Sequence, residues 1–208
     1  MIAFLHTSDI HIPKFEKLVR KYNNDVEIKH FVNSDLLTSA LQTGKTDTDS
    51  FMLEVKKIKK LKPNLIICTC STYGAACDTN ESIHRIDLPI AAYLVGEYDT
   101  IGLAFTATST QLVSEKLLLK QADNIGEKIA ITPIDCSSAW QYYESDDFEN
   151  YARSIAATIV KYQDKVDVVF LAQASMGGAI DYLKDFSKKV FTSPEHGVQE
   201  YLKQIQNK

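Results

Sequence analysis

Short apolar runs recur along the chain at two matching series of intervals, and this spacing constrains the fold more than any other feature. In the first half the runs begin at residues 2, 26, 65 and 90, which gives steps of 24, 39 and 25. In the second half they begin at 100, 128, 166 and 189, which gives steps of 28, 38 and 23. Boundaries inferred from a sequence err by about two to four residues, so the series agree. We therefore expect two copies of one unit of roughly 95 residues, with a chance similarity of spacing as the alternative.

The runs have the composition of strands in a parallel sheet. Several are apolar on both faces, which is typical of parallel strands covered by helices. Two intervening segments have a helical period, and each places its apolar residues on one face: 51–61 with Phe51, Val55, Ile58 and Leu61, and 147–163 with Phe148, Tyr151, Ile155, Ile159 and Tyr162. Ser145 followed by Asp146 and Asp147 is the expected start of the second helix. We expect strands at 2–8, 26–32, 65–71, 90–94, 100–107, 128–134, 166–174 and 189–192.

The alternation of strands and helices predicts an α/β protein with two pseudo-symmetric, Rossmann-like parallel-sheet halves and a site in the cleft between them. We assign residues 1–95 plus 190–208 to the first half and residues 96–189 to the second half. The crossover between the halves is expected within residues 93–99.

Composition excludes several classes of protein. The 208 residues are 45% hydrophobic and 24% charged, with a net charge of −4, which is ordinary for a soluble globular protein. The acidic balance argues against nucleic acid or an anionic membrane as a partner. No apolar stretch approaches the ~20 residues of a membrane span, and the start MIAFLHTSDIH lacks the basic segment of a signal peptide. Four cysteines do not make a disulfide scaffold, so we expect reduced thiols and a cytoplasmic location.

Hydroxyl and thiol side chains collect where the predicted strands end. Ligands of doubly wound sheets bind beyond the carboxyl ends of the strands. Small hydroxyl residues at such turns either cap the following helix or help to hold an anion. We expect a small carboxylic acid or amino acid as the ligand, bound by Thr7, Ser8, Ser71, Thr72, Thr106, Thr108, Gln173 and Ser175.

Cys70 is the candidate catalytic residue. It ends an apolar strand and precedes Ser71, which we expect to open a helix. A thiol at a helix N-terminus has a lowered pKa, so we expect the pKa of Cys70 to lie below the ~8.5 of a free thiol. A buried and unreactive cysteine is the alternative, and it suits Cys68 and Cys77 better. A zinc site of Cys68, Cys70, Cys77 and His84 is not favoured, because no CxxC pair is present. No nucleotide-binding motif is present, and we expect neither a metal nor a cofactor.

The order of these motifs resembles the aspartate/glutamate/hydantoin racemase superfamily. Cys70-Ser71-Thr72 matches the superfamily's Cys-Asn-Thr type motif after the third strand. Thr106-Ala107-Thr108 is similar to its substrate loop at the start of the second half, and residues 192–195 to its last strand-to-helix turn. The resemblance covers essentially the whole chain. It implies cofactor-independent 1,1-proton transfer, in which one cysteine removes the proton next to a carboxylate and a second cysteine delivers one to the opposite face.

The chain departs from this pattern at the second cysteine. The corresponding segment after the seventh strand is Ala172-Gln173-Ala174-Ser175, so Gln173 stands where the partner cysteine is expected. An amide can hold a carboxylate or a carbonyl group, but it carries no proton.

Three interpretations remain open. The protein is a one-cysteine isomerase or lyase/decarboxylase, in which the thiol is a proton donor or a nucleophile. Alternatively, it is a racemase whose second base is Cys136, His6 or His196. The third interpretation is a non-catalytic protein that binds a small carboxylate. A homodimer is left open in each case.

The arginines give no further guidance on the substrate. Arg20, Arg85 and Arg153 all fall in segments expected to be helical, away from the strand ends. A charged distal group on the substrate therefore has no expected partner. This favours a substrate with a neutral side chain, or with a second carboxylate held by hydroxyl groups.

Overall fold

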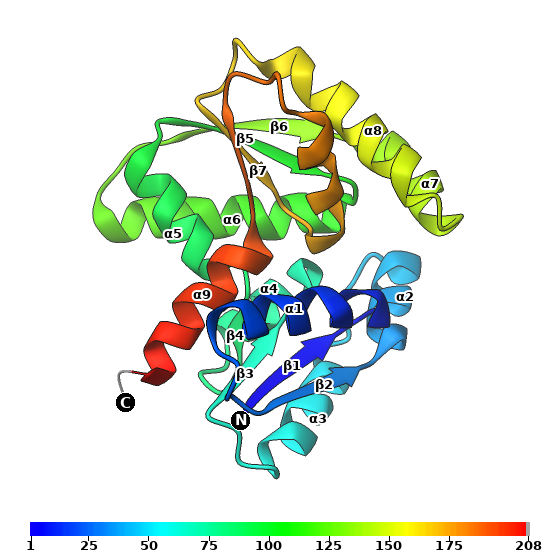
Figure 1. Cartoon of the computed structure of the whole chain (residues 1–208), viewed down its shortest axis with the longest axis vertical. Coiled ribbons are helices and arrows are strands. Elements are labelled where there is room, and N and C mark those ends of the chain that lie inside the picture. Colours follow the sequence, from blue (N-terminus) through cyan, green and yellow to red (C-terminus); the bar gives the residue numbers. More distant parts are fainter. Residues whose placement is uncertain (207–208) are drawn as a thin grey trace. The chain divides into compact units, whose positions relative to one another are not determined.

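Each half of the chain forms its own parallel sheet. The structure is a computed structural model, and it describes residues 1–206. The first sheet has the strand order β2-β1-β3-β4 and the second has β6-β5-β7-β8, with parallel pairing in both (Figure 1). The two orders are the same when β1 is matched with β5. This confirms the α/β class and the predicted internal repeat.

The strand positions repeat as well as the strand order. Strands start at residues 2, 28, 65 and 84 in the first sheet and at 100, 130, 168 and 189 in the second, so the steps are 26, 37 and 19 against 30, 38 and 21. The strands are β1 (Ile2–His6), β2 (Ile28–Val32), β3 (Leu65–Cys68), β4 (His84–Arg85), β5 (Thr100–Phe105), β6 (Ala130–Asp135), β7 (Val168–Leu171) and β8 (Lys189–Thr192).

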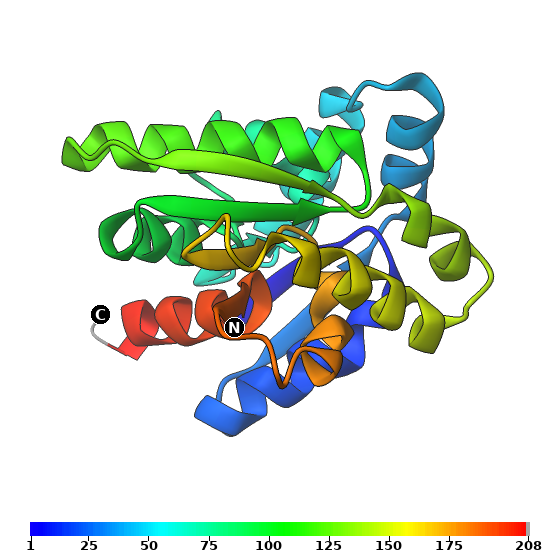
Figure 2. The same cartoon turned by 90° about the horizontal axis from the view of Figure 1, so that it is seen from above.

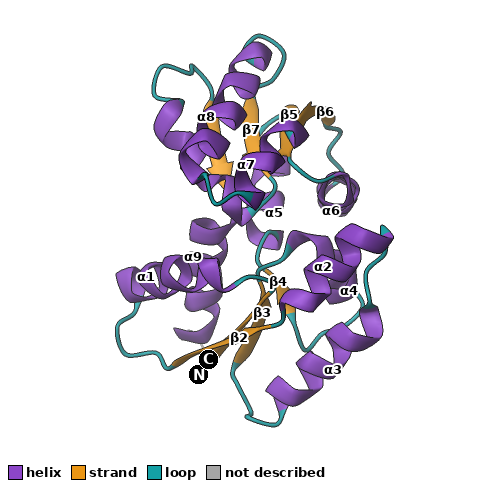
Figure 3. Cartoon of the chain, turned by 90° about the vertical axis from the view of Figure 1, so that its right-hand side faces the viewer, coloured by secondary structure: helices purple, strands orange, loops and turns teal. Residues whose placement is uncertain are grey.

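Helices cover both faces of each sheet, which explains why the strands are apolar on both sides. In the first unit α1 and α9 pack on one face, and α2, α3 and α4 pack on the other (Figure 3). In the second unit α8 lies on one face and α6 runs along β5 on the other (Figure 2). The α-helices are α1 (Ile12–Tyr22), α2 (Ser34–Thr43), α3 (Thr48–Lys59), α4 (Gly74–Asp78), α5 (Leu88–Glu97), α6 (Thr108–Ile125), α7 (Trp140–Glu144), α8 (Phe148–Ile159) and α9 (Ser193–Gln206). Short 3-10 helices are η1 (Asp9–His11), η2 (Ser71–Tyr73), η3 (Ser137–Ala139), η4 (Val160–Tyr162) and η5 (Ala174–Tyr182).

One predicted strand is wrong. Residues 90–94 lie in helix α5, with Ile90 and Leu94 buried. A short apolar run does not distinguish a buried strand from a buried helix. Here the alanines at 91 and 92 favour the helix, and Pro89 is tolerated in its first turn. The fourth strand is instead β4, which has only two residues and is too short to leave a pattern in the sequence.

Two predicted details of the helices are also wrong. Leu61 is 48% exposed and does not continue the buried face of α3, because that helix ends at Lys59. The N-cap of α8 is Asp147 rather than Ser145: its carboxylate accepts a hydrogen bond from the backbone N–H of Asn150 at 3.1 Å. Asp47 caps α3 in the same way, through the N–H of Ser50 at 3.0 Å.

The chain returns to the first unit through its last helix. One unit consists of Met1–Leu88 and Pro194–Lys208, and the other of Pro89–Ser193. Helix α9 is held in the first unit by the hydroxyl of Tyr201, which donates to the carbonyl of Arg85 at 2.8 Å, and by Glu195, which binds Lys21 at 2.6 Å. Residues 89–95 and 190–193, which the sequence assigns to the first half, lie in the second unit.

Arg85 was expected in a helix but lies in strand β4. Its guanidinium is buried and contacts the Asp87 carboxylate at 2.7 and 2.9 Å and the Asp78 carboxylate at 3.0 Å. Both carboxylates raise the pKa of Arg85 against the effect of burial, so the group stays charged. Arg85 is thus fully engaged within the first unit and is no free partner for a ligand.

The close approach of α9 to the chain before α5 requires a glycine at position 197. A Cβ atom there would overlap the backbone carbonyl oxygen of Ile86, whereas a Cβ at Gly96 in α5 would meet nothing within 4 Å. We predict that Gly197→Ala lowers the free energy of unfolding by about 1–3 kcal/mol through overpacking. The matched Gly96→Ala should raise it by up to about 1 kcal/mol. Urea denaturation of both variants is the measurement, and equal effects would contradict this packing.

Candidate functional site

Cys70 and Gln173 occupy equivalent turns of the two units. Leu5 of β1 lies opposite Cys68 of β3, and Ala104 of β5 lies opposite Leu171 of β7. Cys70 and Gln173 each follow two residues later, and each is the N-cap of a 3-10 helix with extended backbone angles (φ −96° and −121°). The two turns therefore occupy the same position in their respective sheets.

The Cys70 sulfur is surrounded by hydrogen-bond donors. The Thr7 hydroxyl and the backbone N–H groups of Thr72 and Tyr73 lie near it, and each of them lowers its pKa by favouring the thiolate. Burial favours the neutral thiol and is the larger effect, and the neighbouring Cys68 also raises the pKa of Cys70. The balance raises the pKa of Cys70 to about 11.

The expected low pKa of Cys70 is thus wrong for this structure. That expectation depends on the start of a helix, but the helices that follow Cys70 are η2 with three residues and α4 with five. Such short helices offer little dipole. Cys70 packs against the apolar cluster between the first sheet and α2, α3 and α4, and that packing disfavours the charged form. At neutral pH Cys70 is a neutral thiol.

Gln173 makes the corresponding contact in the second unit. Its side-chain oxygen Oε1 accepts two hydrogen bonds from Thr106, from the backbone N–H at 2.7 Å and from the hydroxyl at 2.9 Å. Thr106 follows β5 as Thr7 follows β1. Equivalent threonine hydroxyls therefore lie beside a sulfur in one unit and an amide oxygen in the other.

Tyr151 extends this network and was not singled out from the sequence as a functional residue. Its buried phenol oxygen lies 3.2 Å from the Thr106 hydroxyl and 3.1 Å from the Ser175 hydroxyl. The ring of Tyr143 packs on it, with 5.3 Å between ring centroids. The internal repeat was the available signal: Tyr151 is four residues after the N-cap Asp147, and Phe51 is four residues after the N-cap Asp47.

The remaining predicted ligand-binding residues lie at the expected strand ends. Thr7, Thr72 and Thr106 are buried, Ser8, Ser71 and Ser175 are half-buried, and Thr108 is exposed at the start of α6. Ser8 is the N-cap residue of η1, but its hydroxyl makes no capping hydrogen bond. The first unit thus gathers Thr7 and Thr72 around Cys70, and the second gathers Thr106 and Ser175 around Gln173.

His6 is buried within a chain of hydrogen bonds. Its Nδ1 lies 2.8 Å from the Thr69 hydroxyl, and its Nε2 lies 2.8 Å from Nδ1 of His30. Nε2 of His30 in turn contacts the Glu16 carboxylate at 3.0 Å. Burial, and next the neighbouring His30, lower the pKa of His6 to about 3. His6 is therefore neutral with both ring nitrogens engaged, which does not favour it as a second base.

The other two proposed second bases differ in accessibility. Cys136 is fully buried, and burial together with the nearby Asp135 raises its pKa to about 12. His196 in α9 is half-buried, and burial lowers its pKa. Of the three candidates, the side chain of His196 alone has appreciable exposure.

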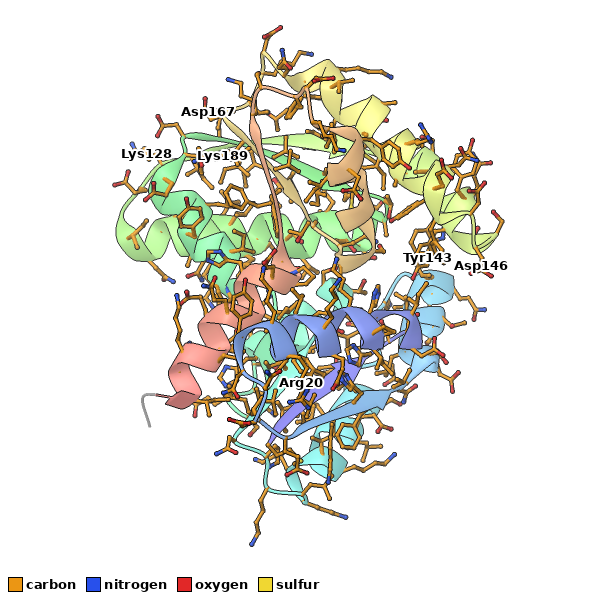
Figure 4. All side chains as sticks on the ribbon, viewed as in Figure 1. Arg20, Lys128, Tyr143, Asp146, Asp167 and Lys189 are labelled. Carbon is orange, nitrogen blue, oxygen red and sulfur yellow. The ribbon has the colours of Figure 1, made fainter. Side chains whose placement is uncertain are left out.

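The ends of the sheets opposite these turns carry charged residues. Lys128, Asp167 and Lys189 lie where strands β6, β7 and β8 begin, and Asp167 accepts the N–H of Thr100 at 2.9 Å (Figure 4). In the first unit Lys59, Lys62 and His84 line a cavity of about 300 Å³ at the corresponding end. Within residues 1–206, no group of three or more His, Cys, Asp or Glu side chains is arranged to hold a metal ion.

Comparisons with known proteins identify the fold. No family model and no curated protein matches the sequence. Among solved structures, the Picrophilus torridus aspartate racemase is 14% identical and superposes with a TM-score of 0.73 over 99% of this chain and 94% of that one. A glutamate racemase from Bacillus anthracis is 13% identical, with a TM-score of 0.74 over 100% and 82%. The allantoin racemase from Klebsiella pneumoniae is 10% identical, with a TM-score of 0.65 over 99% and 87%.

This chain has the fold of the aspartate/glutamate/hydantoin racemase superfamily. The likeness found in the sequence from short motifs is confirmed at the level of the fold. In the described part of the chain, the helices are too short or too polar to cross a membrane.

The raised pKa of Cys70 gives a direct prediction for its reactivity. Only the thiolate is alkylated, so the rate of iodoacetamide labelling at Cys70 should rise about tenfold per pH unit between pH 8 and pH 10. Cys68, Cys77 and Cys136 are buried and should label more slowly at each pH. Peptide mass spectrometry of wild type and Cys70→Ser gives the rate at each site. A labelling rate at Cys70 that levels off below pH 9 would contradict the raised pKa.

The buried His6 makes the protein sensitive to acid. Its pKa is about 3 in the folded protein against 6.5 in the unfolded chain, so the unfolded chain binds the proton first. Stability from this group is complete above pH 6.5 and declines as the pH falls below it. From this difference in pKa, the free energy of unfolding should fall by about 2 kcal/mol between pH 8 and pH 5.

Urea unfolding of wild type and His6→Gln at these two pH values tests this prediction. The decrease in the free energy of unfolding from pH 8 to pH 5 should be smaller in His6→Gln by about 2 kcal/mol, because glutamine does not titrate. The same pH dependence in both proteins would show that His6 is not the group responsible.

Proposed function

We propose that the protein is a one-thiol enzyme that protonates the carbon next to the carboxylate of a small acid. It would act as a cofactor-independent isomerase or lyase. One observation carries the proposal: of two equivalent turns, one holds a thiol that is neutral at physiological pH, and the other holds an amide that cannot transfer a proton.

Cys70 suits the role of proton donor. When one carboxylate leaves as CO2 from the carbon next to a second carboxylate, the electron pair of the broken C–C bond stays on that carbon. The thiol proton is transferred to this carbon, so one C–H bond forms, the S–H bond breaks and no group is oxidised. The resulting thiolate is stabilised by the Thr7 hydroxyl and by the N–H groups of Thr72 and Tyr73 until water returns the proton.

Gln173 limits the stereochemistry. A planar carbanion can be protonated on either face, and a racemase needs a proton-transfer group on each side. Because the equivalent turn of the second unit holds an amide and no thiol, only the face of the carbanion that meets Cys70 would receive a proton from a thiol of these turns. The product of a decarboxylation would then be a single enantiomer.

Racemisation is the second candidate function, and the fold favours it. The similar solved structures named above are racemases of aspartate, glutamate and allantoin. This function requires a second base. Because Cys136 and His6 are buried, His196 would be the most accessible substitute. A non-catalytic carboxylate-binding protein is the remaining alternative.

Turnover in heavy water separates these functions. Both enantiomers of aspartate and glutamate, allantoin, and a 2-alkylmalonate are incubated with the protein, and deuterium is located by NMR. We predict deuterium on the carbon next to the carboxylate, in one enantiomer only. Cys70→Ser should slow the reaction by 100-fold or more, since a positioned acid contributes about 10²–10⁴ in rate.

Two control variants identify the alternatives. Cys136→Ser and His196→Gln should leave the rate and the stereochemistry unchanged. If wild type interconverts both enantiomers of one substrate and either variant stops this, the protein is a racemase with a substitute base. Binding of these acids without any Cys70-dependent turnover would favour the non-catalytic alternative.

A further inference from the structure

The orientation of the Gln173 amide is determined by its surroundings. A backbone N–H can only donate, so the atom 2.7 Å from the Thr106 nitrogen must be the side-chain oxygen of Gln173. The Thr106 hydroxyl lies 2.9 Å from the same oxygen, and an amide oxygen can only accept. Both acceptor positions of Oε1 are therefore filled from within the second unit.

The direction of the adjoining hydroxyl chain follows from counting protons. Thr106 has one hydroxyl proton, and it goes to Gln173. The contact between Thr106 and Tyr151 then requires Tyr151 to donate, and the contact between Tyr151 and Ser175 requires Ser175 to donate. The chain runs in one direction from Ser175 through Tyr151 and Thr106 to Gln173. Each hydroxyl is committed, and Ser175 retains only lone pairs.

The nitrogen of Gln173 remains available. Among residues 1–206, no hydrogen bond from its Nε2 is formed, and the only fully buried side-chain polar atom without a partner is Oγ of Ser114. Nε2 is therefore accessible. The turn after β7 thus presents the N–H donors of Gln173 to a ligand.

The equivalent turn of the first unit lacks this arrangement. Phe51 occupies the place of Tyr151 and has no hydroxyl group, so no hydroxyl chain runs from that position to Thr7. The tyrosine is thus found in the unit that has the amide. Because Tyr151 donates to the Thr106 hydroxyl, the Thr106 proton is left for the oxygen of Gln173. Such an arrangement fixes the orientation of the amide.

We propose that Gln173 is a specificity-determining residue that binds an oxygen acceptor of the ligand, a carboxylate or carbonyl oxygen, and rejects an ammonium group at that position. Tyr151 is its positioning residue and acts through Thr106. The inference rests on the proposed function only in taking a small acid as the ligand. An amide that was free to turn would accept from an ammonium group as readily as it donates to a carboxylate. This one is not free to turn.

Side-chain NMR of the full chain tests the proposal independently of catalysis. The protein is labelled with ¹⁵N-glutamine, and the Gln173 NH₂ signals are assigned as those lost in Gln173→Met. Malonate is then titrated, with 1,3-diaminopropane as the matched cationic probe. We expect the Gln173 NH₂ signals to shift with malonate and to stay in place with the diamine. A shift with the diamine, or no shift with malonate, would overturn the proposal.

Two variants distinguish a positioning role of Tyr151 from a loss of folded structure. Tyr151→Phe should keep the Gln173 signals but weaken malonate binding about three- to tenfold, the effect of one hydrogen bond. Gln173→Glu should weaken malonate more than tenfold, because it replaces donors with a like charge, and should bind the diamine more tightly than wild type does. Unchanged affinities in both variants would contradict the assigned roles even if Gln173→Met fails to fold.

The outcomes also distinguish this inference from the proposed function. Malonate shifts at Gln173 without Cys70-dependent turnover would support the inference and refute the one-thiol reaction. Cys70-dependent turnover with the same KM in wild type, Tyr151→Phe and Gln173→Glu would support the reaction and refute the role of Gln173.

Discussion

In each unit a threonine at the end of the first strand lies beside the turn after the third strand, and this contact determines what the turn can hold. The Thr7 hydroxyl favours the charged form of the Cys70 sulfur, and the Thr106 hydroxyl donates to the amide oxygen of Gln173. Parallel pairing brings the carboxyl ends of the two strands together, so the contact follows from the fold and is the same in both units. The residue beside the threonine then differs between the units: a neutral thiol in one turn and an amide of fixed orientation in the other.

Burial decides the state of the titratable groups around these turns. The donors around Cys70 favour the thiolate, but the apolar packing beneath it outweighs them and keeps the proton on sulfur. The same effect keeps His6 neutral and raises the pKa of Cys136 and Tyr151. A protonated thiol surrounded by three donors is suited to giving a proton, because the donors stabilise the thiolate that forms when the proton leaves.

The sequence was sufficient to predict the fold and the strands that precede the candidate residues, for a physical reason. Parallel strands buried on both faces leave apolar runs, and the runs around 65–71 and 166–174 fall on β3 and β7. The equivalence of Cys70 and Gln173 follows from those strands. Residues 90–94 were misassigned because an apolar run of that length fits a buried helix equally well.

The chemistry of the site was less predictable, because it depends on packing between distant segments. The pKa of Cys70 reflects helices α2 to α4, which the local sequence does not describe. The helical period places Tyr151 in the core, and its ring is indeed buried. The period gives no indication that its hydroxyl contacts Thr106 and Ser175.

The protonation state of Cys70 is the central claim of this account, and the infrared S–H stretching band measures it directly. A difference spectrum between wild type and Cys70→Ser isolates the band of this one thiol, and the band is followed as the pH rises. We predict an S–H band that persists through pH 9 and is half lost near pH 11. A band already absent at pH 8 would show that Cys70 rests as a thiolate, which would contradict its role as the proton donor.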